Sequence, residues 1–225
     1  MHRITLASLI CFALAAPAKA ENSPLHAAAY NGHVVLVRIL VANGANVNVM
    51  NEHGWTPLHA AAAGGYPVTI NALLDREAYV NAEDRDGWTP LHEAAYGGHS
   101  AAIEALIRRG ANINAYNEDI GTPLHAAALE AHPVAIEALL AGGANADARD
   151  KIGGTALHQA AYHFHSAAIE ALLAGGANVN AKTDTGLTPI DAAQSRIEKE
   201  KTEASVVPIV AFEEAIEILK ASGGR

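Results

Sequence analysis

One motif is written into this chain six times at a constant spacing of 33 residues, and this repetition limits which folds the chain can adopt. Three copies read Thr-Pro-Leu-His-x-Ala, the other three differ from it at one or two positions, and no insertion disturbs the spacing between the first copy and the last. A constant period of this length indicates structural units that stack on their neighbours and share one core. The copies begin at these residues: Ser23, Thr56, Thr89, Thr122, Thr155 and Thr188.

The sequence of each repeat predicts two short helices, as the copy that begins at Thr89 illustrates. Thr89 followed by Pro90 is an N-cap and first helical position, because the hydroxyl accepts an orphan amide and proline needs no amide there. An alanine-containing first helix then stops near Gly98. A second helix carries the apolar pair Ile103 and Leu106, which predicts the stripe that faces the core.

The pattern Gly-Trp-Thr-Pro-Leu-His-x-Ala at period 33 resembles the ankyrin repeat. The resemblance covers residues 23 to about 193 and resumes near Ala215. It implies an all-α repeat solenoid of stacked helix-turn-helix units with short β-hairpin fingers, occupying residues 21–225. It also implies a concave face that binds proteins and is not known for catalysis, and a local hydrogen bond for each motif histidine.

The first twenty residues have the pattern of a secretory signal peptide. A positive start at His2 and Arg3 precedes an apolar run from Ile4 to Ala16, and Ala18-Lys19-Ala20 predicts cleavage after Ala20. We therefore expect a periplasmic or secreted protein, with an uncleaved N-terminal anchor as the alternative. The single cysteine lies inside this run, so the mature chain has no disulfide.

The charge balance excludes several classes of partner. The chain has 15 basic and 24 acidic residues, a net charge of −9, which repels phosphate backbones. We expect no nucleic-acid partner, no membrane partner after signal cleavage, no cofactor and no bound metal. The chain also has no recognisable catalytic motif, and we expect it not to be an enzyme. The alternative from another class is a small metal-dependent hydrolase near Glu130, His163 and His165.

Both ends depart from the repeat pattern. The second helix of repeat one is unusually apolar over residues 34–41, which indicates either packing on repeat two or a surface for self-association. In the last repeat Asp191 replaces the motif histidine, and the equivalent of Ile169 appears at Ile216, 14 residues later than the period predicts. We expect residues 194–225 to form an extended C-terminal cap that contains this insertion.

The resemblance places partner-binding residues at the fingertips and at the end of each first helix. We expect Trp55 and Trp88 to be the apolar anchors, or alternatively to pack between fingers. The most concrete prediction is a non-enzymatic, exported scaffold that binds or regulates another protein; a secreted effector acting on a host protein is the alternative. The partner-binding candidates are Glu52, His53, Trp55, Arg85, Asp86, Trp88, Glu93, Tyr96, Tyr162 and His163.

Overall fold

The computed structural model describes residues 23–202 and 209–224, and all of the regular structure in these ranges is helical. The predicted signal peptide lies outside the described residues. None of the described helices is both long and apolar enough to cross a membrane. The helices are α2 (Pro24–Tyr30), α3 (Val34–Ala42), α4 (Pro57–Ala63), α5 (Pro67–Leu74), α6 (Pro90–Tyr96), α7 (Ser100–Arg108), α8 (Pro123–Leu129), α9 (Pro133–Ala141), α10 (Ala156–Tyr162), α11 (Ser166–Ala174), α12 (Pro189–Thr202) and α13 (Ile209–Ala221).

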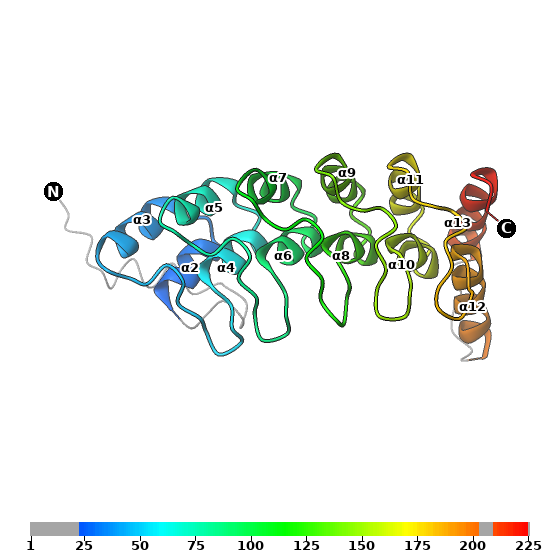
Figure 1. Ribbon diagram of the computed structural model, residues 1–225, viewed down its shortest axis with the longest axis horizontal. Helices are drawn as coiled ribbons and strands as arrows, with labels where there is room; N and C mark the ends of the chain where they lie inside the picture. Colours follow the sequence, from blue (N-terminus) through cyan, green and yellow to red (C-terminus); the bar gives the residue numbers. More distant parts are fainter. Residues whose placement is uncertain (1–22, 203–208, 225) are drawn as a thin grey trace. The chain divides into compact units, whose positions relative to one another are not determined.

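The helices fall into two compact units, each built from two rows. In unit 1, which ends at residue 112, α2, α4 and α6 form one row and α3, α5 and α7 the other (Figure 1). In unit 2, α8, α10 and α12 form one row and α9, α11 and α13 the other. The predicted helix-turn-helix architecture is therefore confirmed.

In repeats two to five the apolar pair of the second helix lies in the core, as the sequence predicts. Burying a side chain of this size stabilises the fold by about 1.5–3 kcal/mol. Eight members of the predicted stripe have no exposed surface: Ile70, Leu73, Ile103, Leu106, Ile136, Leu139, Ile169 and Leu172.

The motif histidine completes the N-cap of its own helix and also bonds to the next repeat. The Nδ1 atom of His59 accepts the backbone N–H of Thr56 at 3.2 Å, and the Thr56 hydroxyl lies 2.8 Å from the same nitrogen. Because Nδ1 accepts, Nε2 carries the proton and donates to the Trp88 carbonyl at 3.0 Å. His26, His125 and His158 make the same forward bond within their units. These four bonds hold the loop that carries each acceptor carbonyl against the helix that carries the histidine.

A second histidine position makes the opposite connection. His99 Nε2 donates to the carbonyl of Ala63, at the end of α4, over 2.9 Å, and His165 Nε2 donates to the carbonyl of Leu129, at the end of α8, over 3.0 Å. Both carbonyls belong to the last turn of a helix, where no intrahelical donor remains. Within each unit the two histidine positions thus bond a repeat in opposite directions, the motif histidines to the repeat that follows and His99 and His165 to the repeat that precedes.

The loops that connect successive repeats are the predicted fingers, and we number them in chain order. Finger 1 spans residues 43–56, finger 2 spans 75–89, finger 4 spans 142–155 and finger 5 spans 175–188. Their tips close with hairpin bonds such as Asn51 N–H to Trp55 O at 3.0 Å and Asp84 N–H to Trp88 O at 2.9 Å. Among the described residues only Asn117 and Gly121 form a bridge, so the hairpins are turns without extended strands.

The last repeat differs from the others in its cap and in its length. Asp191 accepts from the Thr188 backbone N–H and hydroxyl, each at 2.8 Å, which reproduces the local half of the histidine's role. Asn180 donates to the carbonyl of Gly223, 43 positions later in the sequence. The equivalent residue of repeat one, Asn48, donates to the carbonyl of Glu77, which is only 29 positions later. The 14 additional residues therefore lie within the stretch that contains the end of α12 and the start of α13.

Replacement of Glu77 by glycine should stabilise the chain. Glu77 has a φ of +66°, in the left-handed region that costs a non-glycine residue about 1–2 kcal/mol, and glycines occupy the equivalent positions in the other complete repeats. Glycine gains more entropy on unfolding than glutamate does, which offsets part of this gain. We therefore expect a net increase of roughly 0.5–1 kcal/mol in the free energy of unfolding. Urea unfolding measures it. Glu83→Gly, in the same finger but without positive φ, is the control and should not stabilise the chain.

Candidate functional site

The tips of fingers 1 and 2 carry charged side chains on tight turns. In each turn one buried side chain accepts hydrogen bonds from the backbone. Asp84 Oδ1 accepts the backbone N–H groups of Asp86 and Trp88, each at 2.9 Å. Asn51 makes the equivalent bonds in finger 1. The two turns leave Glu52, Arg85 and Asp86 exposed and His53 half-buried. Asn51 and Asp84 were absent from our candidate list, although the recurring Asp/Asn-x-x-Gly turn is a signal for them.

The two fingers are also bonded to each other through their main chains. The Arg85 N–H donates to the His53 carbonyl at 3.1 Å. A Cβ added to Gly54 would lie 2.7 Å from the Arg85 nitrogen, so only glycine permits this approach. The structure thus brings four of the predicted residues, Glu52, His53, Arg85 and Asp86, onto one pair of neighbouring fingertips.

Trp55 is not available as the apolar anchor that we expected. Its side chain is 4% exposed, its Nε1 donates to Asp84 Oδ2 at 3.1 Å, and its ring stacks near His59 with the ring centres 6.4 Å apart. These contacts correspond to the alternative that we left open, packing between fingers. The physical reason is that finger 2 covers the indole and accepts its only polar hydrogen.

Trp88 lies in a different environment although it follows the same sequence motif. It is half-buried and packs edge-to-face against Tyr96, with ring centres 5.5 Å apart, and also against His92 at 5.8 Å. Tyr96 ends α6 and is 41% exposed. The equivalent position in repeat two is Ala63, so the aromatic pair exists only where the tyrosine is present.

Glu93 was predicted to bind a partner, and the structure buries it instead. Its side chain is 8% exposed within α6, which packs against α4. A buried glutamate does not orient a partner at the surface, so we remove Glu93 from the binding set. The helical register explains the burial, because Glu93 occupies the position of the buried alanines Ala60 and Ala126.

In unit 2 the structure brings Tyr162 and His163 together at the end of α10. Their rings meet edge-to-face at 5.2 Å, and the Arg196 guanidinium of α12 lies 5.3 Å from the centre of the tyrosine ring. Partial burial, the neighbouring His165 and Arg196 lower the pKa of His163, while Glu130 opposes the shift. These predicted residues therefore form a second cluster, in unit 2.

The alternative metal site near Glu130, His163 and His165 finds little support in this geometry. The two imidazoles are stacked with centres 5.6 Å apart, and His165 Nε2 is bonded to a backbone carbonyl. No group of three His, Cys, Asp or Glu in the described part of the chain could hold a metal ion. Phe164, which lies between the histidines, packs on Phe212 of α13 at 5.6 Å and anchors the last helix.

The apolar second helix of repeat one is only partly covered. Val37 is buried, as the packing interpretation predicts, but Val35 is 67% exposed and Ile39 is also exposed. Leu36 and Leu40 are half-buried. The packing interpretation therefore holds for one side of α3, and the exposed side remains a candidate surface for self-association.

Comparisons with known proteins agree with this geometry. A family model described as ankyrin repeats in three copies matches residues 5–84, 25–117, 65–150 and 124–200. Among solved structures, the human ASB11 ankyrin repeat domain is 30% identical and superposes with a TM-score of 0.76. The match covers 91% of this chain and 85% of that one. None of the curated protein sequences compared with the chain matches it.

Proposed function

Because the chain belongs to the ankyrin repeat family, we propose that it is a non-catalytic binding module that holds another protein against the tips of fingers 1 and 2 and the end of α6. The observation that carries this proposal is the Trp88–Tyr96 pair, an apolar surface that borders charged fingertips in unit 1. Aromatic residues inside a ring of polar ones are typical of interface hot spots.

The charges of the fingertips support a role in orienting the partner. Glu52, Arg85 and Asp86 are exposed and stand on turns that backbone bonds hold in place. Charged groups at the rim of an interface contribute mainly to specificity and association rate. We therefore assign Trp88 and Tyr96 to affinity and these three residues to orientation.

Substitution of Tyr96 by serine tests this assignment. We expect Tyr96→Ser to weaken partner binding by tenfold or more, about 1.4 kcal/mol, because it removes the exposed half of the aromatic pair. The partner is first captured with the mature chain from an extract and identified by mass spectrometry. Its affinity for each variant is then measured by calorimetry.

Tyr79 offers a matched control, since it is 66% exposed, belongs to the same unit and precedes the tip turn of finger 2 that Asp84 closes. Tyr79→Ser should change the affinity less than twofold, with both variants folded by circular dichroism. Equal weakening by Tyr96→Ser and Tyr79→Ser would contradict the proposed surface.

Export is the second element of the proposal and depends on residues 1–20 of the sequence. The positive start, the apolar run and the Ala-x-Ala site occur in the order that signal peptidase requires. We expect the exported protein to begin at Glu21, which N-terminal sequencing measures directly. A mature chain that retains residues 4–16 would contradict cleavage. Recovery from the culture medium instead of the periplasm would favour the effector alternative.

A further inference from the structure

The side of α3 that faces away from α5 is apolar and uncovered. Leu36 and Leu40 are half-buried there, and Ile39 is 43% exposed. The helices α5 and α7 each pack on the second helix of the preceding repeat, and their equivalent side chains are buried. The equivalents are Thr69, Ala72 and Leu73 in α5 and Ala102, Ala105 and Leu106 in α7. These positions therefore face a preceding repeat, and we call Leu36, Ile39 and Leu40 the α3 face.

The α3 face is too bulky for a further repeat at the spacing of the others. Every repeat from two to five has alanine or threonine at the position of Leu36 and alanine at the position of Ile39. Small side chains at these positions let the preceding helix approach closely, because the distance between packed helices depends on the side chains at their contact. Residues spaced by three and four positions lie on one side of a helix and pack into the grooves of another. The α3 face thus suits a helix that lies farther away than a preceding repeat would.

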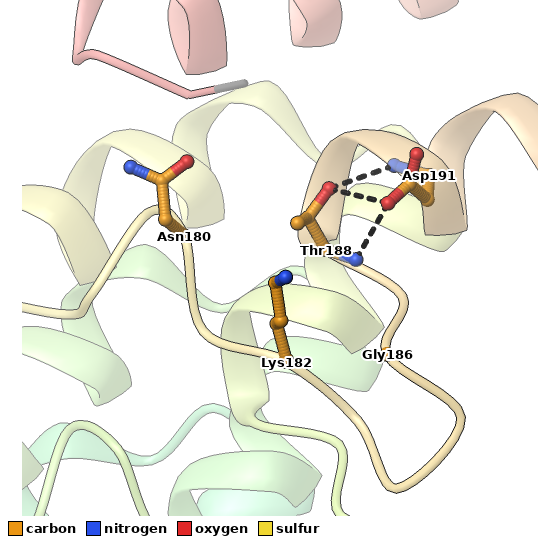
Figure 2. Close-up of a pocket in the computed structure, with 5 residues that line it drawn as sticks. All are labelled: Asn180, Lys182, Gly186, Thr188 and Asp191. Carbon is orange, nitrogen blue, oxygen red and sulfur yellow. Dashed lines mark hydrogen bonds between the residues drawn. The ribbon is translucent and has the colours of Figure 1, made fainter.

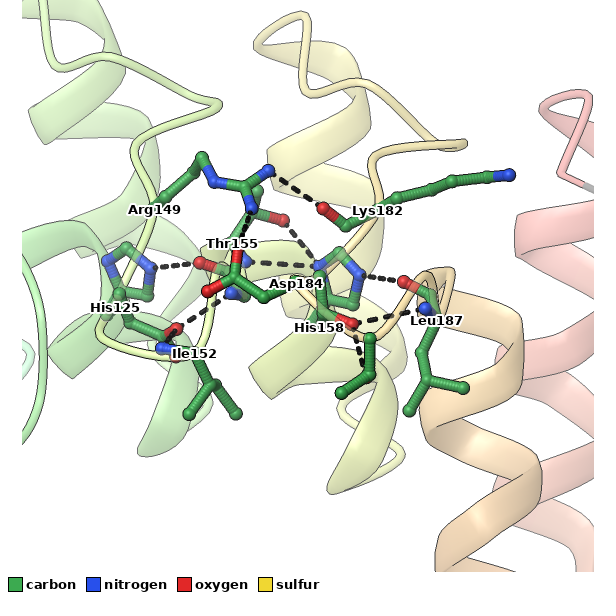
Figure 3. A network of polar contacts seen from close by, with 12 residues as sticks. His125, Arg149, Ile152, Thr155, His158, Lys182, Asp184 and Leu187 are labelled. Atoms are coloured by element: carbon green, nitrogen blue, oxygen red, sulfur yellow. Dashed lines mark hydrogen bonds and ion pairs between the residues drawn. The ribbon is translucent and has the colours of Figure 1, made fainter.

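Repeats inside the chain are also joined through their fingers, and repeat one lacks this connection on its open side. Figure 3 shows finger 5 against finger 4: the Asp184 N–H donates to the Ile152 carbonyl at 3.0 Å, and Arg149 pairs with the Asp184 carboxylate at 2.6 Å. The proposed mature chain begins only two residues before Ser23, and two residues span at most about 7 Å. It therefore has no finger before α2, and its own N-terminus is too short to cover the α3 face.

The last repeat carries polar groups where repeat one is apolar, as is common for an end repeat. Lys220 of α13 is exposed and occupies the position of Leu173 in α11. Finger 5 borders a pocket of about 450 Å³ (Figure 2). The residues that line this pocket are Asn180, Lys182, Gly186, Thr188 and Asp191. Burying such charged groups against the α3 face of a second copy would cost desolvation without a compensating bond, so contact from last repeat to first is unfavourable.

Repeat one is also the only repeat without a carboxylate side chain. Residues 23–51 contain no Asp or Glu, and their single Lys or Arg is Arg38, which is exposed. Every other repeat has two or more acidic residues, and the chain has a net charge of −9. Two copies with this net charge repel each other, and the repulsion is weakest where neither copy presents a carboxylate. The α3 face is therefore the place at which two copies can approach.

We propose that two copies of the mature chain associate through the α3 face, with α3 of one copy packed on α3 of the other about a two-fold axis. A two-fold interface uses the same surface of both copies, so an apolar helix face is its own complement. The inference rests on the proposed cleavage after Ala20 and goes beyond the proposed function, whose Trp88–Tyr96 surface belongs to finger 2 and α6. Because α3 has only nine residues, this contact is smaller than a standard interface and the association is weak.

Sedimentation equilibrium of the exported, cleaved chain tests the proposal. We expect the average mass to rise from that of one copy to that of two as the concentration increases through the micromolar range. Ile39→Lys should weaken this association by about tenfold, because it places a charge in the apolar contact of both copies. Circular dichroism verifies that the variant is folded.

Val68→Lys is the matched control, since Val68 is also β-branched and is 61% exposed on α5 of the same unit. It should leave the association unchanged. A single copy at every concentration up to the millimolar range, or equal weakening by both variants, would overturn the assignment. Loss of a captured partner protein in Ile39→Lys, with the unsubstituted chain a single copy, would also overturn it, because that partner would then occupy the face. N-terminal sequencing of the same sample tests the cleavage separately, so the failure of one proposal is distinguishable from the failure of the other.

Discussion

Replacement of His59 by alanine is expected to lower the free energy of unfolding by about 3–4 kcal/mol. The imidazole is fully buried and bonds to Thr56 in its own repeat and to the Trp88 carbonyl in the next. Its removal leaves a buried N–H group and a carbonyl without their partner, each at a cost of about 1–3 kcal/mol, and a cavity besides. Urea unfolding followed by circular dichroism measures the change.

His53→Ala is the matched control, because His53 stands on a fingertip and is half-exposed. We expect it to change the free energy of unfolding by less than about 0.5 kcal/mol. A loss below 1 kcal/mol for His59→Ala would show that the bonds between repeats contribute little to stability. The core pairs of the second helices would then account for most of it.

Acid should destabilise the chain between about pH 6.5 and pH 4, before most carboxylates titrate. Burial lowers the pKa of His59 to about 4 and also lowers the pKa of His26, His125 and His158. The unfolded chain therefore binds protons in this range while the folded chain does not, so stability is present above pH 6.5 and is lost as the pH falls. His59 alone accounts for roughly 3 kcal/mol at the lower end.

The measurement is the urea midpoint at successive pH values from 7.5 to 4.5. The carboxylate with a lowered pKa, Asp191, contributes at lower pH, because its stabilisation is lost only as the pH falls below its usual value near 3.8. A flat profile from pH 7.5 to 4.5 would contradict neutral, buried histidines.

The comparison of sequence and structure is clearest for the two tryptophans. Residues 54–59 and 87–92 both read Gly-Trp-Thr-Pro-Leu-His, and from the sequence both tryptophans were equal candidates for an anchor. The structure buries Trp55 against finger 2 and leaves Trp88 half-buried beside Tyr96. Trp55 is bonded to a residue 29 positions away and Trp88 packs on one 8 positions away, and a local motif reports neither contact.

Repetition explains why the architecture was predictable from the sequence alone. Each repeat carries its own cap, glycine stop and apolar pair, so local propensity and the fixed period of 33 residues independently specify the same helical hairpin. The motif histidines were correctly interpreted as structural, because a residue that recurs in register with the caps is explained by the caps.

Exposure and pairing between repeats, in contrast, were decided only by the tertiary structure. Whether Glu93 is buried, whether Phe164 anchors α13 and which carbonyl His165 reaches all depend on side chains one or more repeats away. The physical reason is that a repeat buries its apolar and polar groups against its neighbours, so the substitutions in one repeat determine what the next one exposes. The sequence alone thus determines the hairpin and its caps, and the stacking determines which residues are left for a partner.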